Sequence, residues 1–106
     1  MAESIVSLGP ELGWVPYADP GSKVLEQSLR DVASATNATL LAQHGVLAWG
    51  ADLTMALARL ELVEHLAKIH VHAQAMGGVK PLPAASVAAM SAKHVKAGLA
   101  APEMKL

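Results

Sequence analysis

The feature that most constrains the fold is a run of two short apolar segments followed directly by a long helical pattern. Residues 39–43 (TLLAQ) and 46–49 (VLAW) have the length and apolar character of strands, and His44-Gly45 separates them. Asp52 is a good N-cap for the helix predicted over residues 53–76, which two glycines end. The pattern predicts two strands that position one histidine at their junction, followed by a long helix.

The predicted long helix is apolar on two nearly opposite sides. A helix of this kind is usually buried on both sides. We therefore expect one side to cover the sheet of this domain and the other to meet a second layer or a second subunit. The first stripe consists of Leu53, Ala56, Leu57, Leu60, Val63, Ala67 and Val71, and the second of Met55, Leu62, Leu66, Ile69 and Ala73.

The N-terminal region is interrupted repeatedly by glycine and proline. These residues occur throughout residues 1–21 and predict that no helix of any length forms there. Residues 5–8 (IVSL) and Trp14-Val15 are expected to be short strands. Ser22 is the expected N-cap of a helix that continues to about Ala33.

The C-terminal region contains one more helical pattern. An alanine-rich helix is predicted over residues 84–97, with a frayed tail from Gly98 onward. His94 lies on this helix between lysines, so we expect its side chain on a solvated face.

Length and composition indicate a small domain with a thin core. At 106 residues the chain is most simply one domain, residues 1–106. It is 53% hydrophobic but only 3% aromatic, and each of its many alanines buries little area. Such a core is thin for a lone monomer, so we expect association through an apolar face.

Charge and cysteine content exclude several classes of function. The net charge of −1 argues against a nucleic-acid binder, which normally carries a basic patch. The chain has no cysteine, which excludes disulfides and thiolate metal sites and is consistent with the cytoplasm. No basic n-region is present, and no apolar run approaches the ~18 residues of a membrane span. We expect a soluble, cytoplasmic protein without a nucleic-acid or membrane partner.

Several histidines invite a metal hypothesis. His70-Val71-His72 resembles the His-x-His pair of many zinc sites, but on a helix the two side chains are roughly 200° apart and cannot hold one ion. His65 and Glu61 are spaced as a surface pair. His44 is different because it stands between two apolar runs. Its surroundings leave two alternatives open, a hydrogen-bonded core imidazole or a functional group.

Three segments resemble one known family. Residues 43–53 (QHGVLAWGADL) resemble the HG-x(4)-G-x-(D/N)-L segment of the class II aldolase/adducin family. Residues 15–21 (VPYADPG) resemble the PYA-x-x-G turn that precedes a helix in this family, and residues 56–77 resemble its long E-x-x-A helix. The resemblance covers most of the chain, from about Glu3 to Leu99, and its motifs are specific when taken together.

The resemblance implies roles for two residues. In the family, the histidine of the HG motif is one of three imidazole ligands of a catalytic divalent metal, usually Zn²⁺, and by position this role falls on His44. Such a metal acts as a Lewis acid that stabilises the enediolate formed when a carbon–carbon bond of a sugar phosphate breaks. Tyr17 matches the tyrosine of the PYA turn, which in some members lies near the active site and assists proton transfer or substrate placement.

The chain also departs from the family pattern. Full-length members take two further histidine ligands from an earlier His-x-His strand, and a catalytic glutamate and phosphate-binding loops from the same N-terminal half. None of these precedes Tyr17. Ala97 stands where some aldolases have a tyrosine that reaches a neighbouring subunit. Because a catalytic zinc site needs about three protein ligands, Zn²⁺ is expected only if another chain completes the site.

The resemblance implies an α/β fold, namely the C-terminal half of a three-layer α/β/α aldolase with helices on part of a mixed, largely antiparallel sheet. Half of such a sheet leaves an unpaired edge, so we expect a homo-oligomer or a complex with an N-terminal-half partner chain. Three functions stay open. In the first, the chain is part of a metal-dependent class II aldolase that acts on a sugar phosphate. In the second, it is a truncated non-catalytic relative that serves as an oligomerisation or interaction module. In the third, it is an unrelated binding protein on the same scaffold.

Overall fold

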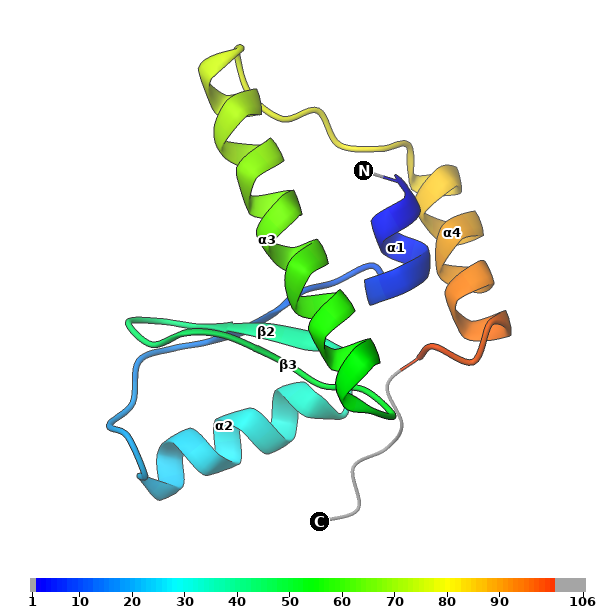
Figure 1. The fold of residues 1–106 in the computed structure, drawn as a ribbon. Coiled ribbons are helices and arrows are strands. Elements are labelled where there is room, and N and C mark those ends of the chain that lie inside the picture. Colours follow the sequence, from blue (N-terminus) through cyan, green and yellow to red (C-terminus); the bar gives the residue numbers. More distant parts are fainter. Residues whose placement is uncertain (1, 101–106) are drawn as a thin grey trace.

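The computed structural model describes residues 2–100, which form three layers (Figure 1). Helix α2 covers one face of a small sheet, and α3 covers the other face. This arrangement is the α/β/α fold that the resemblance implied. In chain order the elements are α1 (Ala2–Leu8), β1 (Gly13–Val15), α2 (Lys23–Ala33), β2 (Ala38–Leu41), β3 (Gly45–Ala48), α3 (Leu53–Ala75) and α4 (Ala84–Lys96).

The sheet has the order β1-β2-β3 and is mixed, as expected. Strand β1 runs parallel to β2, with Gly13 opposite Thr39, whereas β2 and β3 form an antiparallel hairpin, with Leu41 opposite Gly45. Parallel and antiparallel pairings are therefore balanced in the described part of the sheet. The centre of the sheet is well buried, because Thr39 and Val15 are fully inaccessible to solvent.

Both predicted helix caps are present. The Ser22 hydroxyl accepts a hydrogen bond from the Leu25 amide at 3.2 Å, and the Asp52 carboxylate accepts one from the Met55 amide at 2.8 Å. Each cap satisfies an amide that has no partner inside its own helix. The observed starts of α2 and α3 follow directly from these two side chains, which confirms the prediction from sequence.

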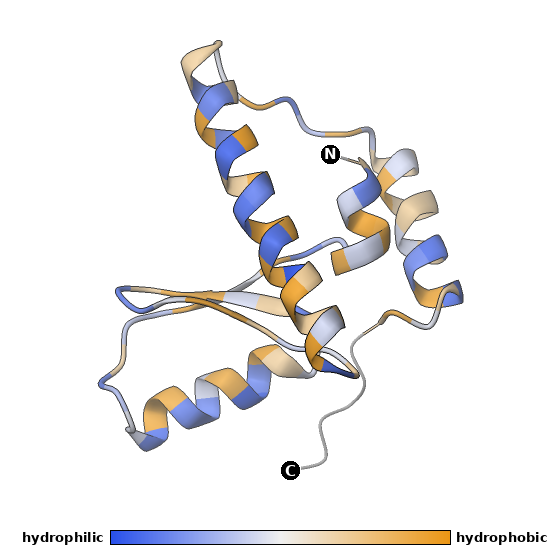
Figure 2. Cartoon of the chain, in the orientation of Figure 1, coloured by the Kyte–Doolittle hydropathy of each residue, from blue (hydrophilic) through white to orange (hydrophobic). Residues whose placement is uncertain are grey.

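Helix α3 carries apolar residues along its whole length, alternating with polar ones (Figure 2), and it packs against other elements of this chain on both sides. One side packs on β2 and β3 and the other on α1, so the second layer expected for this helix is α1. Val63 is buried beside Leu62 and Leu66, while Leu53 and Leu57 are 88% and 55% exposed. No helix within residues 2–100 combines the length and hydropathy needed to cross a bilayer.

The N-terminal helix α1 contradicts the prediction that residues 1–21 contain no helix. The strand expected at residues 5–8 is also wrong, because Ile5 and Leu8 lie one helical turn apart and are both buried. Gly9 and Pro10 end α1 instead of preventing it. Gly9 adopts a φ of +93°, which favours glycine, and its amide donates to the Ile5 carbonyl at 2.9 Å.

The environment of His94 also differs from the expectation. Helix α4 does not pack on the sheet; it packs beside α1 (Figure 1), and His94 is only 5% exposed between the two helices. Its Nδ1–H donates a 2.7 Å hydrogen bond to the Val6 carbonyl. The solvated face predicted for His94 is wrong because the helix that covers it was not foreseen.

A cluster of polar contacts holds the C-terminal segment, which was expected to fray from Gly98. The Leu99 carbonyl accepts from Asn37 Nδ2 at 2.8 Å and from Arg59 Nη2 at 3.4 Å. Arg59 Nη1 also donates to the Trp49 carbonyl at 2.7 Å, and burial lowers the pKa of Arg59. The segment is therefore anchored as far as Leu99, and the rest of the predicted tail, residues 101–106, lies outside the described residues.

Candidate functional site

The site is built on the turn between β2 and β3. Residues 42–44 form this turn, and the His44 amide donates to the Leu41 carbonyl at 3.0 Å. Gln43 has a φ of +65° and Gly45 a φ of +134°, and a side chain at the second of these positions would be strained. Nothing lies near the position of a Gly45 Cβ, so glycine serves the backbone conformation there and not a close approach.

His44 is exposed at the tip of this hairpin. The alternative that His44 is a hydrogen-bonded core imidazole, which the sequence left open, is therefore wrong. Its Nε2 lies 3.0 Å from the Ala18 carbonyl oxygen. Because a carbonyl only accepts hydrogen bonds, Nε2 donates in this contact, and the neutral imidazole with this tautomer has its lone pair on Nδ1. A backbone contact of this kind fixes the tautomer and orientation of histidines that bind metals.

Tyr17 stacks on His44. Their ring centroids are 5.6 Å apart and the rings are nearly parallel, at 10°. The Tyr17 hydroxyl donates to an Asp19 carboxylate oxygen at 3.1 Å. The two residues singled out from the sequence are thus adjacent in the structure. Asp19 was foreseen only as part of a turn, and its position two residues after Tyr17 is the signal that places its carboxylate beside the phenol.

The sheet explains why these residues meet. β1 and β2 run parallel, so their C-termini lie at the same end of the sheet. The Ala42 amide donates to the Val15 carbonyl at 3.0 Å, which continues this pairing to the hairpin turn. Residues 16–19 and 42–44, which are far apart in the sequence, are consequently side by side.

A groove of about 710 Å³ runs from His44 between the sheet and α3. Most of its lining is apolar, and Trp14, 60% exposed, lies at its edge. Glu64 is the one acidic residue among the described residues of the lining, and its carboxylate lies 3.4 Å from the ammonium group of Lys68. The lining of the groove thus contains the imidazole of His44 and the carboxylate of Glu64, and the rest of it is largely apolar.

These residues do not by themselves fit a metal ion. Among residues 2–100, no three histidine, aspartate or glutamate side chains lie close enough together to hold one. A catalytic zinc site takes about three protein ligands, and His44 is a single imidazole. His70 lies on α3, where its Nε2 is 3.2 Å from the Gln74 amide nitrogen, and it belongs to no group of three such side chains among these residues.

Comparison with known proteins assigns the family. The family model described as "Class II Aldolase and Adducin N-terminal domain" matches residues 1–71, which is more than half of the 106 residues. The chain belongs to the class II aldolase and adducin family. Members of this family are generally metal-dependent, whereas the residues described for this member include no complete metal site.

Curated relatives of this aldolase-like chain carry out reactions on phosphorylated sugars or sugar acids, as their names state. The chain is 40% identical over 55 residues to the 3-oxo-tetronate 4-phosphate decarboxylase of Escherichia coli, a match covering 52% of this chain and 26% of the relative. It is 32% identical over 79 residues to the 5-deoxy-D-ribulose 1-phosphate aldolase of Bacillus thuringiensis, covering 74% of this chain and 37% of that enzyme. The chain thus spans well under half the length of these relatives.

A solved structure agrees with this aldolase-like assignment. The fold is similar to that of YgbL from Escherichia coli, a candidate aldolase/epimerase/decarboxylase, with a TM-score of 0.72 and 30% sequence identity. The similarity covers 86% of this chain and 43% of YgbL. Nearly all of the fold described above therefore corresponds to less than half of that chain.

Proposed function

We propose that this chain is the C-terminal part of a metal-dependent class II aldolase-like protein that acts on a small sugar phosphate, in which His44 is one ligand of a Zn²⁺ ion. The remaining ligands and the acid–base group would come from another chain, either an N-terminal-half partner or a second copy. The observation that carries this proposal is the stacking of Tyr17 on His44, whose imidazole lines the groove. The lack of cysteine supports a cytoplasmic location.

The imidazole of His44 is suited to bind a metal ion. Its Nε2–H is held by the Ala18 carbonyl, which leaves the Nδ1 lone pair as the donor atom. The side chain is exposed, so another chain can reach it without unfolding the hairpin. A bound divalent metal would supply Lewis acidity toward substrate oxygens.

Tyr17 and Asp19 would act beside this imidazole. The face of the Tyr17 ring supports one side of His44 and limits its rotation. The Tyr17 hydroxyl donates its single hydrogen to Asp19, so its oxygen can accept a hydrogen bond from a hydroxyl group of a bound sugar; a proton passes from Tyr17 to the sugar only when the bond to Asp19 breaks. We assign Tyr17 a role in substrate placement or proton transfer and Asp19 the orientation of its hydroxyl.

A second candidate is an oligomerisation or interaction module without catalysis. Two observations favour it: residues 2–100 contain no complete set of metal ligands, and large apolar side chains such as Leu57 are exposed. A fold can be retained after its chemistry has been lost. The two candidates differ in whether His44 takes part in metal binding.

The test is metal retention when the chain is supplied with the missing part of the fold. The chain would be mixed with a polypeptide comprising the part of the Bacillus thuringiensis aldolase that lies outside the matched region. Zinc content would be measured after gel filtration of the complex. We expect zinc to be retained by the mixture, and cleavage of 5-deoxyribulose 1-phosphate to follow its retention.

His65→Ala is the matched control for His44→Ala, because His65 is also exposed but lies on α3 and does not line the groove. We expect zinc affinity of the mixture to fall by about 10-fold or more in His44→Ala, in line with the loss of one of about three ligands, and to be unchanged in His65→Ala. Zinc retention that is equal in both variants would exclude His44 as a ligand. A mixture that forms but retains no zinc would favour the non-catalytic module.

A further inference from the structure

Gln43 occupies the hairpin turn in a backbone conformation that glutamine rarely adopts. The turn comprises residues 41–44 and is closed by the hydrogen bond from the His44 amide to the Leu41 carbonyl. Gln43 is its third residue and has a φ of +65°, the one positive φ outside glycine within residues 2–100. Glycine and asparagine are preferred at such a position, because other side chains crowd the backbone there. The conformation of the turn alone therefore does not favour glutamine.

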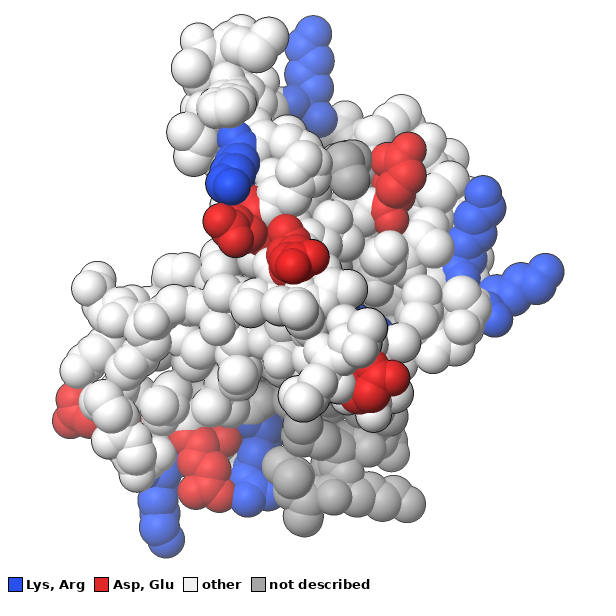
Figure 3. Space-filling model, in the orientation of Figure 1, with Lys and Arg blue, Asp and Glu red and all other residues white. Residues whose placement is uncertain are grey.

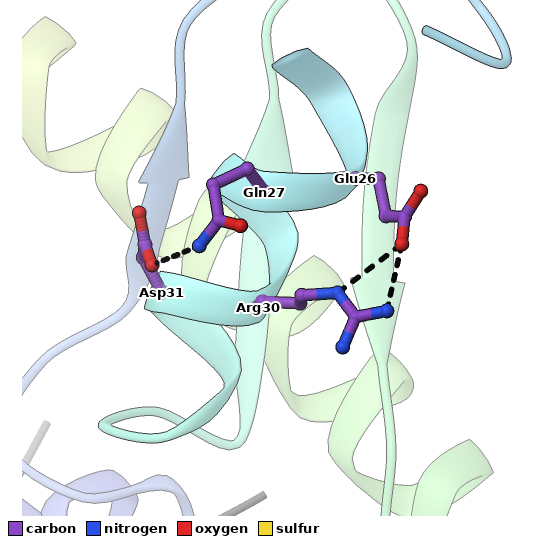
Figure 4. Close-up of polar contacts among 4 residues, drawn as sticks. All are labelled: Glu26, Gln27, Arg30 and Asp31. Carbon is purple, nitrogen blue, oxygen red and sulfur yellow. Dashed lines mark hydrogen bonds and ion pairs between the residues drawn. The ribbon is translucent and has the colours of Figure 1, made fainter. Parts of the chain in front are cut away.

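No polar contact of the Gln43 side chain compensates for this strain. The side chain is exposed, and its carboxamide makes no hydrogen bond with any of residues 2–100. The other glutamines of the chain differ in this respect. Gln27 Nε2 donates to an Asp31 carboxylate oxygen at 2.8 Å (Figure 4), and Gln74 Nε2 forms a 3.2 Å hydrogen bond with a ring nitrogen of His70. Because strained residues occur preferentially at functional sites, Gln43 is a candidate for a role outside folding.

Gln43 lines the same groove as the neighbouring His44. The described residues of the lining include the carboxylate of Glu64 but neither lysine nor arginine. Figure 3 shows a broad region without charged side chains across this face of the molecule, between acidic side chains above and mixed charges below. A lining without cations does not suit a phosphate group, whereas a carboxamide both donates and accepts hydrogen bonds, as a sugar hydroxyl does. The groove at Gln43 therefore suits the uncharged, hydroxylated part of a sugar.

We propose that Gln43 is a substrate-binding residue, whose carboxamide forms a hydrogen bond with a hydroxyl group of the sugar beside His44. The inference rests on the proposed function, because it takes a small sugar phosphate as the ligand. The hydroxylated carbon chain of this ligand lies against the groove, and its phosphate group lies away from the Glu64 carboxylate, which would repel it. Asparagine would fit the turn better but is one methylene shorter, so glutamine gives the carboxamide a longer reach.

Thermal unfolding of the chain alone tests whether Gln43 serves the fold. Gln43→Asn relieves the strain, because asparagine adopts a positive φ more readily. We expect its Tm to equal or exceed that of the natural chain, by up to roughly 5 °C. Gln27→Asn is the matched control, which should lower Tm because it weakens the contact with Asp31 and places a poorer helix former in α2. A Tm of Gln43→Asn below that of the natural chain would show that the side chain stabilises the fold and would overturn the proposal.

Kinetics of the completed fold test the role of Gln43 in binding. The chain would be mixed with the Bacillus thuringiensis polypeptide described above and assayed for cleavage of 5-deoxyribulose 1-phosphate. In Gln43→Leu, which lacks the carboxamide, we expect KM to rise about 5–10-fold, as for the loss of one hydrogen bond between neutral groups. The value of kcat and the zinc content should stay within about twofold, because binding that is lost equally in the ground and transition states raises KM alone. Gln74→Leu, exposed on α3 outside the groove, is the matched control and should leave KM unchanged.

The possible outcomes separate this inference from the proposed function. A mixture that retains zinc and cleaves the substrate, with the same KM in Gln43→Leu as in the natural chain, would overturn the role of Gln43 and leave the proposed function intact. An unchanged KM together with weaker association of Gln43→Leu with the added polypeptide, measured by gel filtration, would overturn it in favour of a contact between the two chains. A mixture of the natural chain that neither retains zinc nor cleaves the substrate would overturn the proposed function, and this inference with it.

Discussion

Replacing Arg59 by alanine tests how the two halves of the fold are held together. Arg59 is 8% exposed and has no carboxylate partner among the described residues. It donates instead to backbone carbonyls at the end of β3 and in the C-terminal segment, at 2.7 Å to Trp49 and 3.4 Å to Leu99. One side chain of α3 thereby fixes the end of the sheet and the segment that follows α4.

The expected loss of stability follows from these contacts. A hydrogen bond from a charged donor contributes about 1.5–3 kcal/mol, and the bond to Trp49 has the short distance of a strong one. The contact to Leu99 is long and contributes less. Burial of the guanidinium, which also lowers the pKa of Arg59, opposes part of this gain. We expect the free energy of unfolding to fall by about 2 kcal/mol in Arg59→Ala.

Thermal unfolding followed by circular dichroism measures this loss. For a domain of this size, 2 kcal/mol corresponds to a fall in Tm of roughly 8–16 °C. Arg30→Ala is the matched control, because the Arg30 pair with Glu26 is exposed and such pairs contribute only about 0.3–0.5 kcal/mol. Equal changes of Tm in the two variants would refute the reasoning that buried carbonyl contacts, and not arginine as such, stabilise this end of the fold.

Three further predictions concern the remaining contacts. Tyr17→Ala should remove the ring-current shift of the His44 imidazole protons in NMR spectra, whereas Tyr17→Phe should keep it, since only the ring makes the stack; equal shifts in both variants would argue against the stack. His94→Phe should speed amide exchange in α1, because it leaves a partly buried Val6 carbonyl without its His94 donor at a cost of about 1 kcal/mol; unchanged exchange in α1 would argue against that role. Gly13→Ala should lower the free energy of unfolding by about 1–3 kcal/mol, because a methyl group there would overlap side chains of α2 and β2; an unfolding midpoint in urea equal to that of the natural chain would contradict this.

Local signals in the sequence were sufficient for the elements that carry the site. The capping side chains of Ser22 and Asp52 placed the starts of α2 and α3, because an N-cap acts on its own helix and needs no distant partner. The hairpin around His44 was likewise predicted from two apolar runs and a glycine. The motif resemblance then assigned the family correctly.

Features that depend on distant contacts were missed. Helix α1 spans only seven residues and lies before a glycine and a proline, so its local pattern gave no indication of a helix. It is stabilised by packing on α4, which starts more than 70 residues later, as expected for short helices. Once α1 was missed, the burial of His94 could not be foreseen. The anchoring at Leu99 depends likewise on side chains distant in the sequence, Asn37 and Arg59. The stacking of Tyr17 on His44 depends in the same way on the parallel pairing of β1 with β2, which no local signal predicts.

The distribution of polar contacts over the sheet bears directly on experiments at His44. Asn37 and Arg59 fix the end of the sheet at which β2 begins and β3 ends, whereas His44 lies at the opposite end, on the turn where β2 ends and β3 begins. Among residues 2–100, the ring of His44 has a hydrogen bond with the Ala18 carbonyl and a ring contact with Tyr17, and both lie at the surface. Because exposed hydrogen bonds contribute little to the free energy of unfolding, His44→Ala should unfold at nearly the same temperature as the natural chain. A loss of zinc binding in that variant would then report on the imidazole itself and not on the fold.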